Sequence, residues 1–216
     1  MDEKIIRQNI SETLESNYMP YAMSVIVSRA LPEIDGFKPS HRKLLYTMYK
    51  MSLLKSGRTK SANIVGQTMK LNPHGDSAIY ETMVRLTKGY AALNTPFIDS
   101  KGNFGKIYSR DMAYAASRYT EAKLSDICEE LFGDIEEDSV PFVDNYDGKM
   151  KEPTLLPVTF PNILVNPNQG IAVGMASNIC SFNLGEVCDA TIAYLKSDKE
   201  DVTDYILAPD FSTGGE

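Results

Sequence analysis

The segment Ser117-Arg118-Tyr119-Thr120-Glu121 places a nucleophile directly beside a phosphate-binding side chain. Arginine makes bidentate contacts to phosphate oxygens. A phenol has a pKa of about 10, so its attack on phosphorus needs a neighbouring cation and a positioned base or metal. Because most tyrosines simply pack through an amphipathic ring, the same residues also fit an ordinary packing tyrosine beside an arginine.

A histidine bracketed by proline and glycine forms a second candidate site. The turn Asn72-Pro73-His74-Gly75-Asp76-Ser77 can present the His74 ring and nearby backbone N–H groups to a phosphate. Asp76 or Ser77 would cap the helix that follows. The alternative is an ordinary helix-entry turn without a ligand.

A third candidate is the run at residues 170–175, in which Ile171 stands between two small residues. An apolar side chain presented in this way can wedge between base pairs and kink a duplex. The alternative is a core strand whose small residues allow close backbone packing.

For other ligands the sequence offers little. It has no P-loop glycine pattern, and its acidic run at residues 134–138 is typical of a solvated helix end rather than a metal site. The cysteines lack metal-ligand spacing and fit a reducing cytosol; they are Cys128, Cys180 and Cys188.

The formal net charge of −7 argues against a nucleic-acid partner, but the charges are unevenly distributed. Residues 29–88 hold 11 Lys/Arg and 4 Asp/Glu, and residues 36–75 hold 8 Lys/Arg, both histidines and no acid. The rest of the chain, outside residues 29–88, carries 11 bases and 25 acids. Such asymmetry is typical of a face that binds a polyanion. A solvated helical surface balanced by an acidic neighbour would give the same counts.

Helical spacing of apolar residues predicts a helix over residues 2–27, with a buried end at residues 21–27. The chain is 43% hydrophobic and 24% charged, as in ordinary globular proteins. It has no apolar run of about 18 residues, so no membrane span is expected. Its start lacks the pattern of a secretory leader.

Ser40 is the expected N-cap of the next helix, which would bury Leu44, Leu45 and Met48. Basic residues in its first turn, at positions 41–43, oppose the helix dipole. A bound phosphate would remove this conflict, because a helix N-terminus is itself an anion site.

Two further helices are expected over residues 61–71 and 76–88, the second with Ile79, Met83 and Val84 facing inward. Three short helices within a basic stretch of about 50 residues favour a helix-turn-helix array.

The second half predicts a helix from Arg110 or Thr120 to Gly133, then proline-punctuated strands. The expected strands cover residues 155–160, 163–165 and 170–175. A last helix, capped by Ser181 or Asn183, would run through Leu195. The chain then stops in a predicted loop, so it is expected to be a fragment of a longer protein.

Taken in order, several motifs resemble those of the A subunits of bacterial type IIA DNA topoisomerases, the family that includes DNA gyrase and topoisomerase IV. The resemblance covers the chain from about Ile10 onward. Its motifs are Ala22-Met23-Ser24-Val25-Ile26-Val27-Ser28-Arg29-Ala30-Leu31-Pro32, Asp35-Gly36-Phe37-Lys38-Pro39-Ser40-His41-Arg42, Pro73-His74-Gly75-Asp76-Ser77-Ala78-Ile79-Tyr80, Gly102-Asn103-Phe104-Gly105, Arg118-Tyr119-Thr120-Glu121, Phe142-Val143-Asp144-Asn145-Tyr146-Asp147-Gly148 and Gly170-Ile171-Ala172-Val173-Gly174-Met175-Ala176.

The resemblance implies catalytic roles for four residues. Tyr119 would attack a backbone phosphate and form a 5′-phosphotyrosyl linkage, with Arg118 as the neighbouring transition-state stabiliser. Arg29 and His74 correspond to family residues that line the same cleavage pocket.

The resemblance also implies binding roles. Residues that would contact DNA are Lys38, His41, Arg42, Asn72, His74 and Ile171, the last as the intercalating wedge. Asn72 stands where the family usually has histidine, so only hydrogen bonding carries over. Ser77 and Glu81 lie where the family contacts quinolone drugs.

The implied fold is α+β: an N-terminal helical arm (1–27), a winged-helix breakage-reunion domain (28–152) and the start of a β-rich tower domain (153–216). The implied function is ATP-dependent change of DNA topology during replication and chromosome segregation in the bacterial cytoplasm. An A-subunit homodimer would work within an A2B2 heterotetramer on double-stranded DNA. The B subunit would hold Mg²⁺ and ATP, and this chain no metal or cofactor.

Two other interpretations compete with this one. The isolated chain would be inactive without the rest of the A subunit and without its B subunit. It would then be a catalytically incompetent DNA-binding winged-helix fragment. A winged-helix transcription regulator is a further alternative, which leaves the Arg118-Tyr119 pair and the run at residues 170–176 unexplained.

Overall fold

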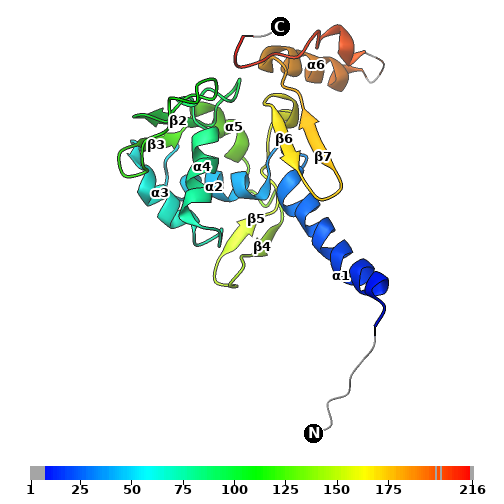
Figure 1. Ribbon diagram of the computed structural model, residues 1–216. Coiled ribbons are helices and arrows are strands. Elements are labelled where there is room, and N and C mark those ends of the chain that lie inside the picture. The colour runs from blue at the N-terminus through cyan, green and yellow to red at the C-terminus, as the bar shows by residue number, and fades with distance from the viewer. Residues whose placement is uncertain (1–7, 198, 200, 215–216) are drawn as a thin grey trace.

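The computed structural model describes residues 8–197, 199 and 201–214, which combine helices with three small antiparallel sheets (Figure 1). The helices are α1 (Ile10–Val25), the π-helical turn η1 (Ile26–Ala30), α2 (Pro39–Lys50), α3 (Ser61–Thr68), α4 (Asp76–Arg85), η2 (Asp126–Cys128), α5 (Glu129–Phe132), η3 (Asn162–Leu164), α6 (Leu184–Lys196) and η4 (Val202–Asp204). The strands are β1 (Thr59–Lys60), β2 (Ile98–Lys101), β3 (Glu121–Leu124), β4 (Phe142–Asp144), β5 (Lys151–Pro153), β6 (Asn168–Ile171) and β7 (Ala176–Ile179). The α+β class is confirmed, whereas the winged-helix and tower assignments and the domain boundaries stay predictions.

The helices α2, α3 and α4 pack on one another and bury the side chains that were expected to face inward. Leu44, Leu45 and Met48 of α2 are at most 1% exposed. On α4, the residues Ile79, Met83 and Val84 are all buried. The helical spacing of apolar residues therefore identified this part of the core correctly.

Two helix starts differ from the sequence expectation. Helix α2 begins at Pro39 and has no side-chain cap, so Ser40 lies inside its first turn. Proline suits this position because its fixed φ is helical and its missing N–H is not needed there. The N-cap of α4 is Gly75, again without a side-chain hydrogen bond, and Asp76 is the first helical residue.

The helix expected between Arg110 and Gly133 is largely wrong, because strand β3 occupies residues 121–124. This strand lies between β1 and β2, with both pairs antiparallel. Ala122 and Leu124 are fully buried, whereas Glu121 and Lys123 are only partly buried. Alternate burial has a period of two residues, which a strand satisfies and a helix does not. Only η2 and α5 are helical here.

The expected strands of the second half are also corrected. Residues 155–160 and 163–165 lie outside any strand, and η3 forms a single turn at Asn162–Leu164. Prolines at positions 157 and 161 remove backbone donors that a sheet would need. Residues 170–175 contain the end of β6 and the turn of the β6–β7 hairpin rather than one strand, with Ala172 N–H donating to Met175 O at 2.9 Å.

Helix α1 projects away from the body, so its end is not buried as expected (Figure 1). Of α1, only Ala22 is buried, and Tyr21 and Met23 are more than half exposed. Residues 2–7 of the expected helix lie outside the described residues. The final helix agrees with expectation: Asn183 caps α6 by accepting from the Gly185 N–H at 2.9 Å.

The hairpin β6–β7 is fixed to the end of η1 at Gly170. A Cβ on Gly170 would lie 1.9 Å from the carbonyl oxygen of Ala30, which is a backbone atom and cannot rotate away. Ser177 of β7 also donates its hydroxyl to Ala30 O. The absence of a side chain at Gly170 therefore sets where the hairpin sits.

We expect Gly170→Ala to destabilise the chain by about 1–3 kcal/mol or more, because the backbone must shift to admit the methyl group. Gly66→Ala is the matched control. Gly66 lies within α3, and a Cβ there would meet no neighbouring atom within 4 Å, so alanine should stabilise the helix by roughly 0.5–1 kcal/mol. Urea unfolding measures both, and equal stability of G170A and the unaltered chain would contradict the contact.

Candidate functional site

Tyr119 lies exposed on a loop that is held from both sides. Its side chain is 65% exposed, and the guanidinium carbon of Arg118 lies 4.8 Å from the centroid of its ring. The next residue, Thr120, is fully buried and donates its hydroxyl to Ser61 Oγ at 2.8 Å. The structure therefore brings together the two residues predicted to form the reactive pair.

Tyr80 of α4 supports the same loop. Its hydroxyl donates to Ala115 O at 2.8 Å and lies 2.9 Å from Thr120 Oγ1. Burial raises the pKa of Tyr80, so the phenol keeps its proton and remains a donor. The loop that carries Tyr119 is thus fixed to the starts of α3 and β3 and to α4.

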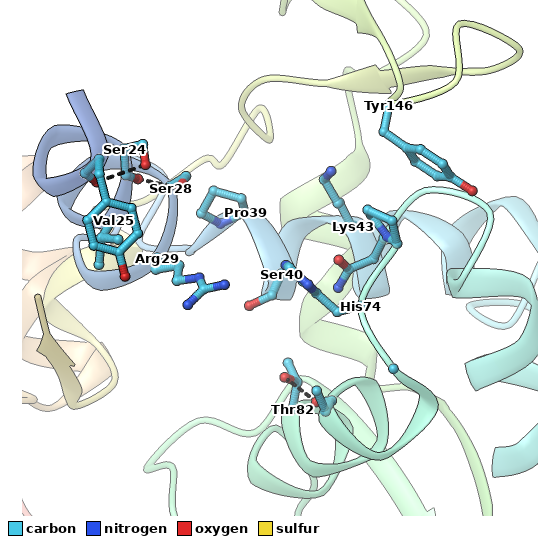
Figure 2. Close-up of a pocket in the computed structure, with 15 residues that line it drawn as sticks. Ser24, Val25, Ser28, Arg29, Pro39, Ser40, Lys43, His74, Thr82 and Tyr146 are labelled. Atoms are coloured by element: carbon cyan, nitrogen blue, oxygen red, sulfur yellow. Dashed lines mark hydrogen bonds between the residues drawn. The ribbon is translucent and has the colours of Figure 1, made fainter. Parts of the chain in front are cut away.

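A pocket of about 810 Å³, here named the basic pocket, opens between η1, α2, α4 and the β4–β5 hairpin (Figure 2). Its lining brings Arg29, Asn72 and His74 together. Arg29 extends from η1 toward Ser40 at the start of α2 (Figure 2). The lining does not include Arg118 or Tyr119, so within one chain the tyrosine stands outside the basic pocket.

Lys43 and Tyr146 also line this pocket, and neither is among the residues to which the resemblance assigns a role. Lys43 Nζ donates to Leu71 O and pairs with Glu152, each at 3.1 Å. Tyr146 is 59% exposed at the tip of the β4–β5 hairpin. A tyrosine inside an Asn-Tyr-Asp-Gly turn was the available signal, because turns present their side chains to solvent.

The three predicted DNA-binding residues at the start of α2 are either bonded within the protein or uncharged. Lys38 Nζ donates to the carbonyl oxygen of Gln169 in β6, and burial together with Arg85 lowers the pKa of Lys38. Burial, helped by Lys38, Arg42 and Arg85, lowers the pKa of His41 to about 3. His41 is therefore neutral at pH 7.

Arg42 forms an ion pair inside the protein with Asp35. Its Nε and Nη2 donate to the Asp35 carboxylate at 2.8 and 2.9 Å, and Nη2 also donates to Phe37 O at 3.1 Å. The two residues are 5% and 1% exposed. A DNA contact by the Arg42 guanidinium is therefore not available in this structure, because Asp35 already neutralises it.

The Asp35 carboxylate also accepts backbone hydrogen bonds from two segments. Phe37 N–H donates to it at 3.0 Å, and Leu156 N–H donates at 2.9 Å. The Asp35 carbonyl accepts from the Asn162 side chain at 2.8 Å. One buried residue thus joins the loop before α2, helix α2 itself and the segment at residues 155–162.

Three further predicted residues are exposed. Ser77 and Glu81 lie one turn apart on α4, and Glu81 accepts from the Tyr114 hydroxyl at 3.4 Å. Ile171 is 88% exposed at the hairpin turn. Such exposure fits a side chain that meets a partner, and it excludes the alternative of a core strand for Ile171.

Other kinds of site find no support in the described part of the chain. Among these residues, no three His, Cys, Asp or Glu side chains come together in a way that could hold a metal ion. None of the described helices is long and apolar enough to cross a membrane.

Comparison with known proteins supplies the family. The family model for the A subunit of DNA gyrase/topoisomerase IV matches residues 29–216. The chain belongs to this family. The DNA gyrase A subunit of Halalkalibacterium halodurans is 48% identical over 214 residues, covering 96% of this chain and 25% of the relative.

Two more relatives in the family show how much of each protein is matched. The DNA topoisomerase 4 A subunit of Rickettsia conorii is 44% identical over 99% of this chain and 29% of its own length. A DNA gyrase A-subunit sequence from Spiroplasma citri is 46% identical over 99% of this chain and 95% of its own length. The chain thus spans about a quarter of the length of the first relatives, whereas the Spiroplasma sequence is matched almost completely.

We expect Asp35→Asn to destabilise this family member by about 3–5 kcal/mol, because Arg42 would keep a buried charge without its counter-ion. Glu121→Gln is the control, since it removes one partner of the surface pair Lys60–Glu121, and exposed pairs contribute little. Urea unfolding midpoints measure both variants. Equal shifts of the unfolding midpoint in D35N and E121Q would show that loss of the buried pair destabilises the protein no more than loss of the surface pair.

His41 predicts a specific dependence of stability on pH. Folded His41 stays neutral down to about pH 3, because its pKa is lowered to about 3, whereas an unfolded histidine takes up a proton near pH 6.5. Below that pH the unfolded state binds the extra proton, so stability falls as the pH drops from about 6.5 toward 3.

Between pH 7 and pH 5 this linkage amounts to about 2 kcal/mol, and His41→Gln should remove it. The measurement is the free energy of unfolding at both pH values. His74→Gln, which replaces the exposed histidine, is the matched control and should retain the dependence. A pH dependence that is unchanged in H41Q would refute the assignment.

Proposed function

We propose that this chain carries the DNA-cleaving residues of a type II topoisomerase A subunit, with Tyr119 as the nucleophile. The observation that carries the proposal is an exposed phenol, paired with the Arg118 guanidinium, on a loop anchored by the buried Thr120. Such a loop can present the phenol to a bound duplex without reorganising. Family membership supports the same role.

In the proposed step, the phenol oxygen of Tyr119 attacks a backbone phosphorus and the P–O3′ bond breaks. The phenol gives up its proton, and the departing 3′ oxygen takes up a proton to become a hydroxyl, so the reaction is balanced. Arg118 stabilises the negative charge that gathers on the phosphoryl oxygens. Because one phosphodiester replaces another, the 3′-hydroxyl can rejoin the strand by the reverse reaction without external energy.

The basic pocket would hold the backbone near the cleaved bond. Arg29 and His74 would supply phosphate contacts, and Asn72 would supply hydrogen bonds. Ile171, exposed at its hairpin turn, would enter the base stack and bend the duplex. Ser77 and Glu81, one turn apart on α4, would contact a quinolone bound at the cut.

The partners follow from the same proposal. Two copies of the chain would cut the two strands, one tyrosine each, and open a gate for a second duplex. The B subunit would supply Mg²⁺ and ATP in an A2B2 assembly associated with the bacterial chromosome in the cytoplasm. Residues 28–152 would be the winged-helix domain that docks on DNA, followed by the start of the tower.

The test uses a complete A subunit carrying this sequence, its B subunit, supercoiled plasmid, Mg²⁺ and a quinolone. After detergent is added, we expect linear DNA with protein attached to its 5′ ends. Tyr119→Phe should reduce this product to background, because phenylalanine has no nucleophilic oxygen. Tyr108→Phe, which alters a tyrosine that is 66% exposed, should leave it unchanged. Linear product from Y119F would refute the assignment.

A further inference from the structure

Carboxylates from other parts of the fold neutralise about half of the basic side chains at residues 36–75. Its ion pairs are Arg42–Asp35, Lys43–Glu152, Arg58–Asp99 and Lys60–Glu121. Lys38 instead donates to a backbone carbonyl. Besides Lys38, the lysines of this stretch with no ion pair among the described residues are Lys50, Lys55 and Lys70. Apart from Lys38, the positive charge of this stretch that no carboxylate pairs therefore lies near the C-terminal ends of α2 and α3.

Two of these lysines border a hollow of about 370 Å³, here named the flank hollow. Its base is apolar and includes Tyr46, Met51 and Leu71. Lys50, Lys70 and Lys151 come from three different segments around its rim, and none of the described acidic residues lines it.

The lysines of the flank hollow are only weakly paired with carboxylates. Lys151 lies 3.3 Å from Asp144, but both side chains are about two-thirds exposed, and such pairs contribute little. The neighbouring hollow that Lys50 shares with Lys55 contains Glu136, which makes it less suited to an anion. The flank hollow is therefore the better of the two for a negatively charged ligand.

The flank hollow continues the basic pocket along one face of α2. Ser40 and Lys43 line the pocket, and Thr47 and Lys50 line the flank hollow. These residues are spaced by three or four positions, so they share one helix face. The Lys43 ammonium, which bonds to Leu71 O and Glu152, lies between the basic pocket and the flank hollow. A strand of DNA that occupies the pocket would therefore reach the three lysines next.

We propose that the flank hollow is a second docking surface for the phosphate backbone of the duplex held in the basic pocket. The inference rests on the proposed function, since it extends the path of the same DNA. Lysines spread over α2, the turn after α3 and β5 suit a polyanion that passes across them better than a small ion held at one point. Each lysine that neutralises a phosphate releases a counterion, so the number of contacts appears in the salt dependence of binding.

The test measures binding of the full chain to a duplex of about 40 base pairs by fluorescence anisotropy across a salt series. The double variant Lys50→Gln/Lys70→Gln should lower the slope of log K against log salt by about 1.8 in magnitude, and each single variant by about 0.9. Lys196→Gln, an exposed change on α6, is the charge-matched control and should leave the slope unchanged. Unfolding midpoints confirm that all variants remain folded.

An unchanged slope in the double variant, or an equal change in K196Q, would overturn the proposal. Absence of any binding by the unaltered chain at low salt would overturn it as well. The outcome is separate from that of the cleavage assay, because Y119F is expected to keep the full salt slope. If the double variant keeps the full salt slope while the cleavage assay supports Tyr119, only the flank hollow is refuted. If the double variant shows the expected slope change while the cleavage assay contradicts Tyr119, only the assignment of the nucleophile is refuted.

Discussion

The buried ion pair between Asp35 and Arg42 is the interaction on which most of the chain's arrangement depends. It lies at the crossing of the loop before α2, helix α2 and the segment that leads to the second hairpin. The carboxylate is enclosed by two guanidinium contacts and two backbone N–H groups, so both of its oxygens are satisfied without water. Removing either partner would leave an uncompensated buried charge, so the fold depends on both residues being present.

The same pair removes Arg42 from the charges that could meet a polyanion. Because Asp35 neutralises Arg42 and burial keeps His41 uncharged, the start of α2 serves to hold the fold together. The charge available to a ligand lies instead around the pocket of Arg29 and His74 and around the flank hollow. The sequence-wide net charge hides this division, since it adds paired and unpaired groups with equal weight.

The sequence predicted those features that depend on local pattern. Helical spacing identified the inward faces of α2 and α4, and the order of motifs identified the family. It failed at β3, where strand structure depends on pairing with residues far away in the chain, and around Gly170, where a hairpin turn resembles a small apolar strand. It also counted Arg42 among the DNA-binding residues, because a sequence does not reveal that Asp35 folds onto it. Propensity and charge are local, whereas pairing and burial are settled only by the whole fold.

The proposed mechanism depends above all on Tyr119, held on its anchored loop beside Arg118, forming the covalent bond to DNA. The most direct measurement is to trap the cleaved complex of the complete enzyme, digest its DNA to a nucleotide remnant and map the modified peptide by mass spectrometry after trypsin treatment. Cleavage after Arg118 and Lys123 isolates Tyr119 as the one tyrosine of a five-residue peptide. We predict the nucleotide mass on residues 119–123. A modified peptide at residues 111–118, which contains Tyr114, or a complex without any modified tyrosine, would contradict this assignment.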